Sequence, residues 1–253
     1  MMAMKTVPRA DVDLADIFNQ PIHMGKLGWK FGHITNNNTL IFLCCLAKAG
    51  FSPIVEFGTF TGRTTYNLAL NTTGKIYTVD IGKNVDAGSN VRGIRYPEYQ
   101  PGEVFLDDPN LKGRIELIIG DSRTLDFSHL HGTVGMVIVD GGHSYEVAKS
   151  DTQKALRMIR AGGIIVWDDY GADWPGVKSA VDELINPEKL IRFEREGIVM
   201  FVNPPASQTL PSSESRDEES RLAPPGRQLP IPRPEGAGPP SQGPNSPNAP
   251  RKK

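Results

Sequence analysis

The chain has 253 residues, a formal net charge of −1 and 38% hydrophobic residues. This composition is typical of a globular protein and lacks the strongly basic balance of nucleic-acid-binding proteins. The sequence contains no apolar run of about 18 residues, and residues 1–16 lack the hydrophobic stretch of a secretion signal. We therefore expect a cytoplasmic protein that binds neither nucleic acid nor membranes.

Composition also divides the chain into three parts. Residues 1–34 form a lead segment, and residues 35–203 are long enough to bury one substantial core. Residues 204–253 hold 13 of the 21 prolines and no aromatic residue. A segment of this kind cannot bury enough apolar area to offset its ordering entropy, so we expect a disordered, Pro-rich tail. Docking of a partner by this tail remains the alternative.

The first expected element is an apolar helix over residues 40–47, which follows a polar cap region at residues 36–39. Both cysteines of the chain, Cys44 and Cys45, are adjacent in this helix. Neighbouring helical side chains point about 100° apart, so the two thiols do not readily bond to each other. We expect reduced, buried cysteines, as in a reducing compartment.

The next element is an apolar strand over residues 54–57, which contains Glu56 and runs into a glycine-punctuated turn. Gly58 and Gly62 allow a tight turn and close approach to a ligand, and the helix expected from Arg63 points free N–H groups toward that ligand. A dinucleotide fingerprint has three glycines spaced G-x-G-x-x-G, which is not the spacing here. The pattern indicates a loop for a nucleotide-type cofactor.

Four more apolar runs end in acidic or glycine residues. The second strand ends at Asp80, the third precedes Asp121 and Ser122, the fourth ends at Asp140 and the fifth at Asp168 and Asp169. Most of these runs are separated by helical patterns, which predicts a parallel sheet. The carboxyl ends of its strands would line one ligand crevice.

Two further segments complete the domain. Residues 82–112 form a long insertion with Arg92, Arg95, Tyr96 and Tyr99, for which a lid over the substrate and a disordered loop remain alternatives. A short helix is expected over residues 176–185. Two apolar runs then flank a glycine-containing turn at residues 195–197, which predicts an antiparallel hairpin over residues 190–202.

The order of these motifs resembles class I S-adenosylmethionine-dependent methyltransferases over about residues 35–203. Residues 56–62, with the pattern E-x-G-x-x-x-G, are similar to the first motif of that class. The motifs at residues 140–146 and 162–170 look like those of small-molecule O-methyltransferases, the group that includes macrocin and related sugar O-methyltransferases. The resemblance implies an α/β, Rossmann-like fold with a mostly parallel seven-stranded sheet and a C-terminal antiparallel hairpin.

The resemblance also implies S-adenosylmethionine as the cofactor. Its expected binding residues are Glu56, Gly58, Gly62, Asp80, Asp121, Ser122 and Asp140. Glu56 would orient the glycine loop or bind the methionine amino group, Asp80 would accept both ribose hydroxyls, and Asp121 with Ser122 would meet the adenine edge. The alternatives are a solvated strand end for Glu56 and local turn roles for Asp80 and Asp121.

In the metal-dependent relatives, acids at the ends of the fourth and fifth strands hold Mg²⁺, and a base follows the first acid by three residues. Carried over, this gives Asp140, Asp168 and Asp169 as metal ligands and His143 as the catalytic base. Converging carboxylates repel unless a cation compensates them, and oxygen ligands suit Mg²⁺, Mn²⁺ or Ca²⁺ rather than zinc. The alternatives are a turn cap at one of the paired aspartates and a capping or metal-supporting role for His143.

These residues together predict methyl transfer to an oxygen of a small molecule that carries neighbouring hydroxyls, such as a sugar or polyphenol. The sequence leaves an oligomer open. Two other functions also remain open, an NAD-dependent oxidoreductase and a noncatalytic scaffold whose tail docks a partner. A thermal-shift comparison of S-adenosylmethionine with NAD separates them, since a ligand that binds only the native state stabilises it.

Overall fold

The computed structural model describes residues 21–28, 37–82, 99–193 and 197–205. The predictions for residues 1–20, for Arg92, Arg95 and Tyr96, and for the tail beyond residue 205 therefore lie outside the described residues. The division of the chain into a lead segment, a domain and a disordered tail stays a prediction.

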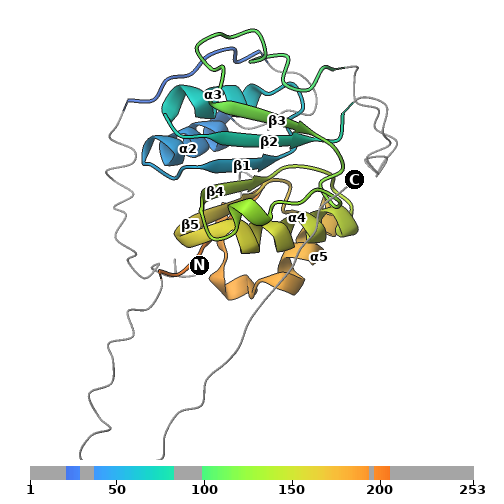
Figure 1. Cartoon of the computed structure of the whole chain (residues 1–253). Helices are drawn as coiled ribbons and strands as arrows, with labels where there is room; N and C mark the ends of the chain where they lie inside the picture. Colours follow the sequence, from blue (N-terminus) through green and yellow to red (C-terminus); the bar gives the residue numbers. More distant parts are fainter. Residues whose placement is uncertain (1–20, 29–36, 83–98, 194–196, 206–253) are drawn as a thin grey trace, which may run out of the picture. The chain divides into compact units, whose positions relative to one another are not determined.

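The described helices and strands alternate along the chain, as Figure 1 shows. In chain order they are α2 (Asn37–Lys48), β1 (Ile54–Phe57), α3 (Arg63–Asn71), β2 (Ile76–Asp80), β3 (Ile115–Ile119), the 3₁₀ turn η1 (Ser128–Leu130), β4 (Val134–Val139), α4 (Tyr145–Met158), β5 (Ile159–Trp167), α5 (Pro175–Leu184), η2 (Pro187–Lys189), β6 (Ile191–Phe193) and β7 (Ile198–Val202).

The strands form one seven-stranded sheet in the order β3-β2-β1-β4-β5-β7-β6. The first five pair in parallel, whereas β7 runs antiparallel to both β5 and β6. The chain reverses its strand order between β1 and β4, and ligands of open α/β sheets bind at such a switch point. The predicted fold, including the C-terminal antiparallel hairpin, is confirmed.

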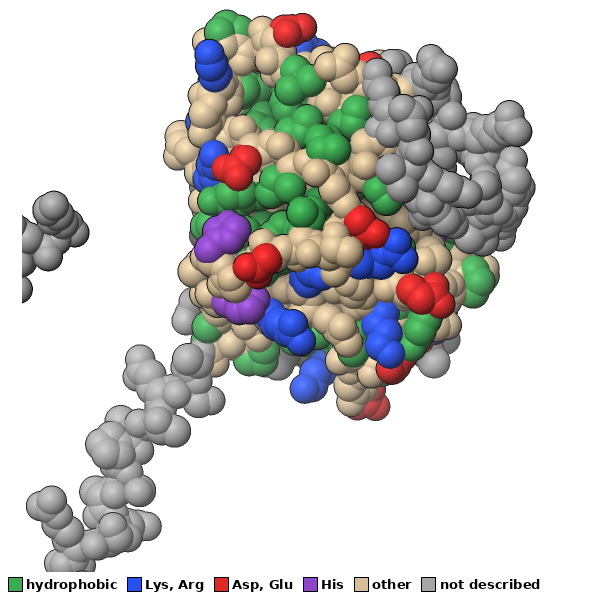
Figure 2. All heavy atoms as spheres, turned by 45° about the vertical axis from the view of Figure 1, so that its right-hand side comes forward, with side chains coloured by type: hydrophobic (Ala, Val, Ile, Leu, Met, Phe, Trp, Pro, Cys, Tyr) green, Lys and Arg blue, Asp and Glu red, His purple; other side chains and the backbone are tan. Residues whose placement is uncertain are grey.

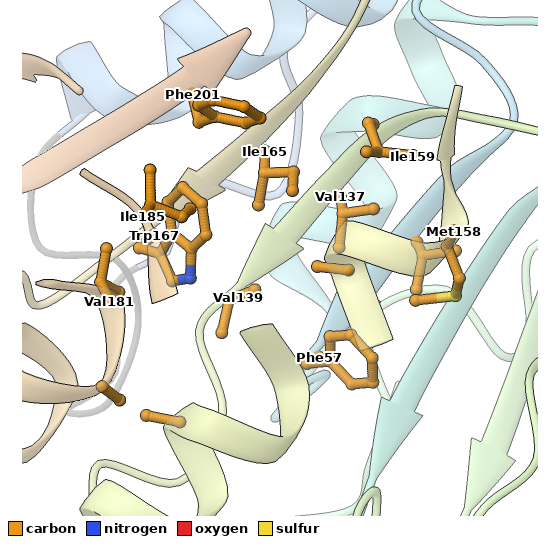
Figure 3. Packing of buried hydrophobic residues seen from close by; sticks show 14 of the residues in the cluster. Phe57, Val137, Val139, Met158, Ile159, Ile165, Trp167, Val181, Ile185 and Phe201 are labelled. Carbon is orange, nitrogen blue, oxygen red and sulfur yellow. The ribbon is translucent and has the colours of Figure 1, made fainter. Parts of the chain in front are cut away.

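Strand side chains alternate between two buried clusters, one on each face of the sheet. On β1, Ile54 faces the cluster that contains buried residues of α2 and α3, whereas Val55 and Phe57 face the cluster under α4 and α5. Figure 3 shows the second cluster, in which Phe57, Val139 and Trp167 from three strands pack with residues of the covering helices. Burial on both faces explains why the central strand β4 is apolar along its whole length.

Two details differ from the sequence-based expectation or refine it. Strand β5 begins at Ile159, directly after α4, and thus earlier than the motif at residues 162–170 indicates. Its early part pairs irregularly, with a register shift between Val134 and Met136 on the neighbouring strand, and glycines in this stretch hid the strand pattern. Cys44 and Cys45 are buried and unbonded, as expected, and burial raises the pKa of the Cys44 thiol to about 12.

The described part of the predicted insertion packs against the domain. Phe105 and Leu111 are buried in the α2/α3 cluster. The amide N–H groups of Gly102 and Val104 donate to the carbonyls of Phe60 and Thr61 in the glycine turn, at 2.9 Å each. Residues 99–112 are therefore part of the wall beside that turn rather than a free loop.

Residues 21–28 are held along α3 by side-chain amides. The amide N–H of His23 donates to Asn71 Oδ1 at 2.8 Å, and that of Gly25 donates to Asn67 Oδ1 at 2.9 Å. Lys26 Nζ reaches further and donates to the Val104 carbonyl at 2.6 Å. This extended segment thus ties α3 to residues 99–112.

Candidate functional site

The glycine turn after β1 lies against the end of β4. Gly58 has φ +98°, and a Cβ at this position would lie 1.9 Å from the carbonyl oxygen of Asp140. The Asp140 amide N–H donates to the Phe57 carbonyl at 2.9 Å, which fixes the two strand ends together. Only glycine fits here, for both backbone conformation and space.

Gly62 is also required by packing within the protein. Its φ is +86°, and a Cβ would meet the Phe105 ring at 2.4 Å. The space that a side chain at residue 62 would occupy is therefore filled by the packed segment 99–112. The predicted tight turn is present, and the close approach of a cofactor to the backbone of Gly62 stays a prediction.

Glu56 is buried beneath the turn, with 1% of its surface exposed. Its Oε2 accepts hydrogen bonds from the hydroxyls of Thr65 and Thr78, the latter at 2.6 Å. Burial raises the pKa of Glu56 to about 7, against the lowering effect of these two hydrogen bonds. The alternative of a solvated strand end is wrong, because Glu56 braces α3 and β2 from within.

Asp80 lies at the end of β2 with 6% of its surface exposed. Its Oδ2 accepts from the amide N–H of Phe60 at 2.8 Å. Its Oδ1 accepts from the amide N–H of Gly82 at 2.8 Å and from the Tyr99 hydroxyl at 3.0 Å. The carboxylate is thus held beside the glycine turn by donors from three segments.

Asp121 and Ser122, at the end of β3, are engaged within the protein. The Asp121 carboxylate accepts from the amide N–H of Arg123 at 2.9 Å and pairs with the Arg123 guanidinium, whose hydrogen bonds hold the pKa of Asp121 below its usual value. Ser122 lies near Asp151, a carboxylate on α4 whose pKa is raised by burial and lowered to a smaller extent by the Ser122 side chain. The turn geometry considered for Asp121 is present, and its adenine contact stays a prediction.

Asp151 itself was not among the predicted site residues. It has 1% of its surface exposed, and its Oδ1 has no hydrogen-bond partner among the described residues. Burial raises the pKa of Asp151 to about 7. Asp151 follows Ala148 by three residues and precedes Ala155 by four, so it lies on the buried face of α4, and this spacing is the signal that could have identified it.

Three side chains form a cluster where β4 and β5 end. One oxygen or nitrogen from each of Asp140, His143 and Asp169 lies within 4.8 Å of the others, an arrangement that could hold a metal ion. His143 Nε2 and Asp169 Oδ2 are 2.6 Å apart. We call these three residues the Asp–His cluster. It adjoins the glycine turn, because the backbone carbonyl of Asp140 packs against Gly58.

The cluster contains His143 where the sequence indicated Asp168. Asp168 lies next to it and raises the pKa of Asp140, although burial is the larger cause and Asp169 contributes as well. Burial, followed by the nearby charge of Asp169, raises the pKa of Asp168 to about 7. The three carboxyl groups therefore do converge, as predicted, and they repel one another.

Neighbours of His143 come from α5, which sequence reasoning did not connect with the site. The Trp174 ring stacks on the imidazole at a centroid distance of 4.1 Å. A Cβ on Gly176 would lie 2.6 Å from the His143 carbonyl, so the start of α5 packs closely on this backbone. Ser144, not His143, caps α4 by accepting from the Val147 amide at 3.4 Å. A capping role for His143 is therefore wrong.

Asp169 has φ +58°, a left-handed conformation that is uncommon for a residue other than glycine. Such strain is found most often where a side chain must be placed for function.

Figure 2 shows a face of the molecule on which hydrophobic side chains gather with acidic side chains among them. No helix in the described part of the chain is long and apolar enough to cross a membrane.

Residues 55–170 match the family model described as a methyltransferase domain. The solved structure of the calicheamicin methyltransferase CalS11 is 15% identical, covers 68% of this chain and 80% of its own, and has a TM-score of 0.51. The O-methyltransferase NovP is 17% identical with coverage of 66% and 79% and a TM-score of 0.53.

A third similar structure is the S-adenosylhomocysteine-bound methyltransferase PaMTH1 from Podospora anserina. It is 13% identical, covers 67% of this chain and 79% of its own, and has a TM-score of 0.50. Identities this low show a shared fold. A comparison with curated protein sequences gives no match. The match to the methyltransferase family model favours S-adenosylmethionine over NAD, the cofactor of the alternative oxidoreductase.

Proposed function

We propose that this class I S-adenosylmethionine-dependent methyltransferase, whose family domain spans residues 55–170, methylates an oxygen of a small molecule that carries neighbouring hydroxyl groups. The observation that carries the proposal is the Asp–His cluster at the switch point of the sheet, behind Gly58. The backbone contact between Gly58 and Asp140 couples the turn expected to hold the methyl donor to the groups expected to handle the acceptor.

In this proposal the first half of the sheet holds the cofactor. Asp80 accepts the ribose hydroxyls, and Glu56 supports the glycine turn through Thr65 and Thr78. Asp121 and Ser122 remain our candidates for the adenine side. The sulfonium of S-adenosylmethionine is already an activated donor, so the protein must mainly align the acceptor oxygen with the methyl group.

His143 is the proposed proton acceptor for the reacting hydroxyl. A separation of 2.6 Å between Nε2 and a carboxylate oxygen requires a proton between them, which leaves the free lone pair of a neutral imidazole on Nδ1. No described residue hydrogen-bonds to His143 Nδ1. Protonation there gives an imidazolium that Asp169 stabilises through Nε2, and since Nδ1 is buried, binding of the acceptor must bring its hydroxyl to this atom.

The residues of the cluster fit a divalent cation. No hydrogen bond to the Asp140 carboxylate is formed by the described residues, and the carboxyl groups of Asp140, Asp168 and Asp169 crowd one another. Asp140 and Asp169 would hold the ion, and this oxygen-rich set suits Mg²⁺ or Mn²⁺. When bound, such an ion lowers the pKa of a coordinated hydroxyl group.

The test is methyl transfer from labelled S-adenosylmethionine to a panel of catechols and sugars with neighbouring hydroxyls. We expect activity to disappear in chelator and to return with Mg²⁺ or Mn²⁺, whereas calorimetric binding of S-adenosylhomocysteine persists throughout. Full activity in chelator rejects the metal role and leaves His143 acting alone. Methylation of none of the hydroxyl acceptors, but of amine or thiol analogues, rejects O-methylation.

A further inference from the structure

The Asp80 carboxylate is almost fully occupied by donors of the protein itself. An ionised carboxylate has about four lone-pair positions. Within the described part of the chain, three of them accept hydrogen bonds from Phe60, Gly82 and Tyr99. A ribose offers two hydroxyl donors, so at least one of the present donors must leave before both can bind.

The three donors differ in how easily they can leave. The N–H of Phe60 belongs to the glycine turn, where φ of Phe60 is +48° and Gly58 N–H donates to the Val79 carbonyl at 2.8 Å. The N–H of Gly82 lies two residues from Asp80 in the same short turn. Both are fixed by the backbone, whereas the Tyr99 hydroxyl is at the tip of a side chain and can rotate away.

Tyr99 is nevertheless held in place over Asp80. Its ring packs on Phe60 at a centroid distance of 4.4 Å. The residues that follow it are anchored on the same turn by the hydrogen bonds of Gly102 and Val104 to Phe60 and Thr61. Tyr99 is thus poised by both neighbours at the position from which its hydroxyl meets Asp80 Oδ1.

We propose that the Tyr99 hydroxyl occupies the position on Asp80 that a ribose hydroxyl takes in the complex, and that Tyr99 thereby sets the affinity for the cofactor. The inference rests on the ribose role proposed for Asp80. In the free protein the Tyr99 hydroxyl keeps the carboxylate hydrogen-bonded and oriented. Binding exchanges this internal donor for a ribose donor, so the measured affinity contains the cost of displacing Tyr99.

Tyr99→Phe tests the proposal, because it removes the competing hydroxyl and keeps the ring that packs on Phe60. We expect S-adenosylhomocysteine to bind about tenfold more tightly to this variant, the scale of one hydrogen bond to a charged acceptor. Tyr77→Phe is the matched control, since Tyr77 lies on the same strand as Asp80 with its ring against the core. Its affinity should equal that of the wild type.

A double-mutant cycle then assigns the effect to Asp80. In an Asp80→Asn background, which weakens binding, Tyr99→Phe should give no further gain, because the shared acceptor has changed. An equal gain in both backgrounds would show that Tyr99 acts elsewhere and would overturn the proposal. Weaker or unchanged binding by Tyr99→Phe in the otherwise native protein would overturn it as well, since the hydroxyl would then assist binding or take no part.

Failure of the proposed function gives a different result. If the wild-type protein does not bind S-adenosylhomocysteine, the cofactor assignment fails before Tyr99 is tested. If it binds and Asp80→Asn has no effect, the ribose role of Asp80 fails. Thermal unfolding of each variant shows whether it is folded. If Tyr99→Phe does not fold, Tyr99→Leu, which also lacks the hydroxyl, provides the same affinity test.

Discussion

The carboxylates at the two halves of the sheet edge differ in their surroundings. On the β1/β2 side, Glu56 and Asp80 accept hydrogen bonds from threonine hydroxyls, backbone amides and a tyrosine. On the β4/β5 side, Asp140, Asp168 and Asp169 crowd one another beside one histidine. The first half is a preorganised support, whereas the second holds unfavourable charge that a substrate, proton or cation can relieve.

The largest expected effect comes from the contact that joins the halves. Gly58→Ala places a methyl group into the Asp140 carbonyl and forces a residue other than glycine to φ +98°. We expect a loss of at least about 3 kcal/mol in the free energy of unfolding, measured by urea denaturation, because backbone must move. Gly113→Ala is the control, with φ +83° and no atom within 4 Å of the added Cβ.

For Gly113→Ala, only the backbone conformation is unfavourable, and we expect a loss of about 1 kcal/mol. Similar losses in the two variants would mean that the halves are not locked together at Gly58. The comparison would then describe two independent sites rather than one coupled edge.

The next effect should be confined to the β4/β5 half. His143→Ala removes the proposed proton acceptor, and we expect turnover to fall by about a hundredfold or more. Calorimetric binding of S-adenosylhomocysteine and of Mn²⁺ should be retained, because Asp80, Asp140 and Asp169 remain. A large loss of Mn²⁺ affinity would instead make His143 a metal ligand, in agreement with its place in the Asp–His cluster.

The smallest effect is on the pH dependence of stability. Glu56 and Asp168 each have a pKa raised to about 7 in the folded protein, so each retains its proton above the pH at which the unfolded chain loses it. The folded state then binds more protons. Their contribution to stability is full below about pH 4 and is lost as pH rises through about 7.

Glu56→Gln and Asp168→Asn should therefore each flatten the decline of stability between about pH 4 and 7, by at most about one proton. Urea denaturation across this range measures the slope. In Glu56→Gln the decline that remains comes from Asp168, and in Asp168→Asn it comes from Glu56. Mg²⁺ should reduce the decline more in Glu56→Gln than in Asp168→Asn, since only the β4/β5 half would bind the ion. An equal effect of Mg²⁺ on both variants would contradict the contrast between the halves.

The fold was predictable from the sequence because its signals are local. Short β-branched runs ending in acidic or glycine residues predict parallel strands, and the two runs around Gly197 predict the hairpin. The same alternation predicts which edge carries Glu56, Asp80 and Asp140. Elements were less certain where glycine weakens the pattern, as at Gly162 in the early part of β5.

The partners of each site residue were not predictable, because they come from distant segments. Nothing near Gly62 in the sequence indicates that Phe105 fills the space beside it. Asp80 accepts a hydrogen bond from Tyr99, which lies 19 residues further along the chain. Asp169, whose carboxylate contacts His143, has a left-handed conformation that the sequence pattern Asp-Asp-Tyr does not reveal.

The stack of Trp174 on His143 gives the protein an optical reporter of its own chemistry. The chain has three tryptophans, of which Trp167 is fully buried and donates to Thr152 within the core, while Trp29 lies outside the described residues. Indole emission is quenched by transfer of an electron to a neighbouring acceptor, and an imidazolium accepts an electron more readily than a neutral imidazole. Emission from Trp174 should therefore dim whenever His143 takes up a proton and brighten when it gives the proton away.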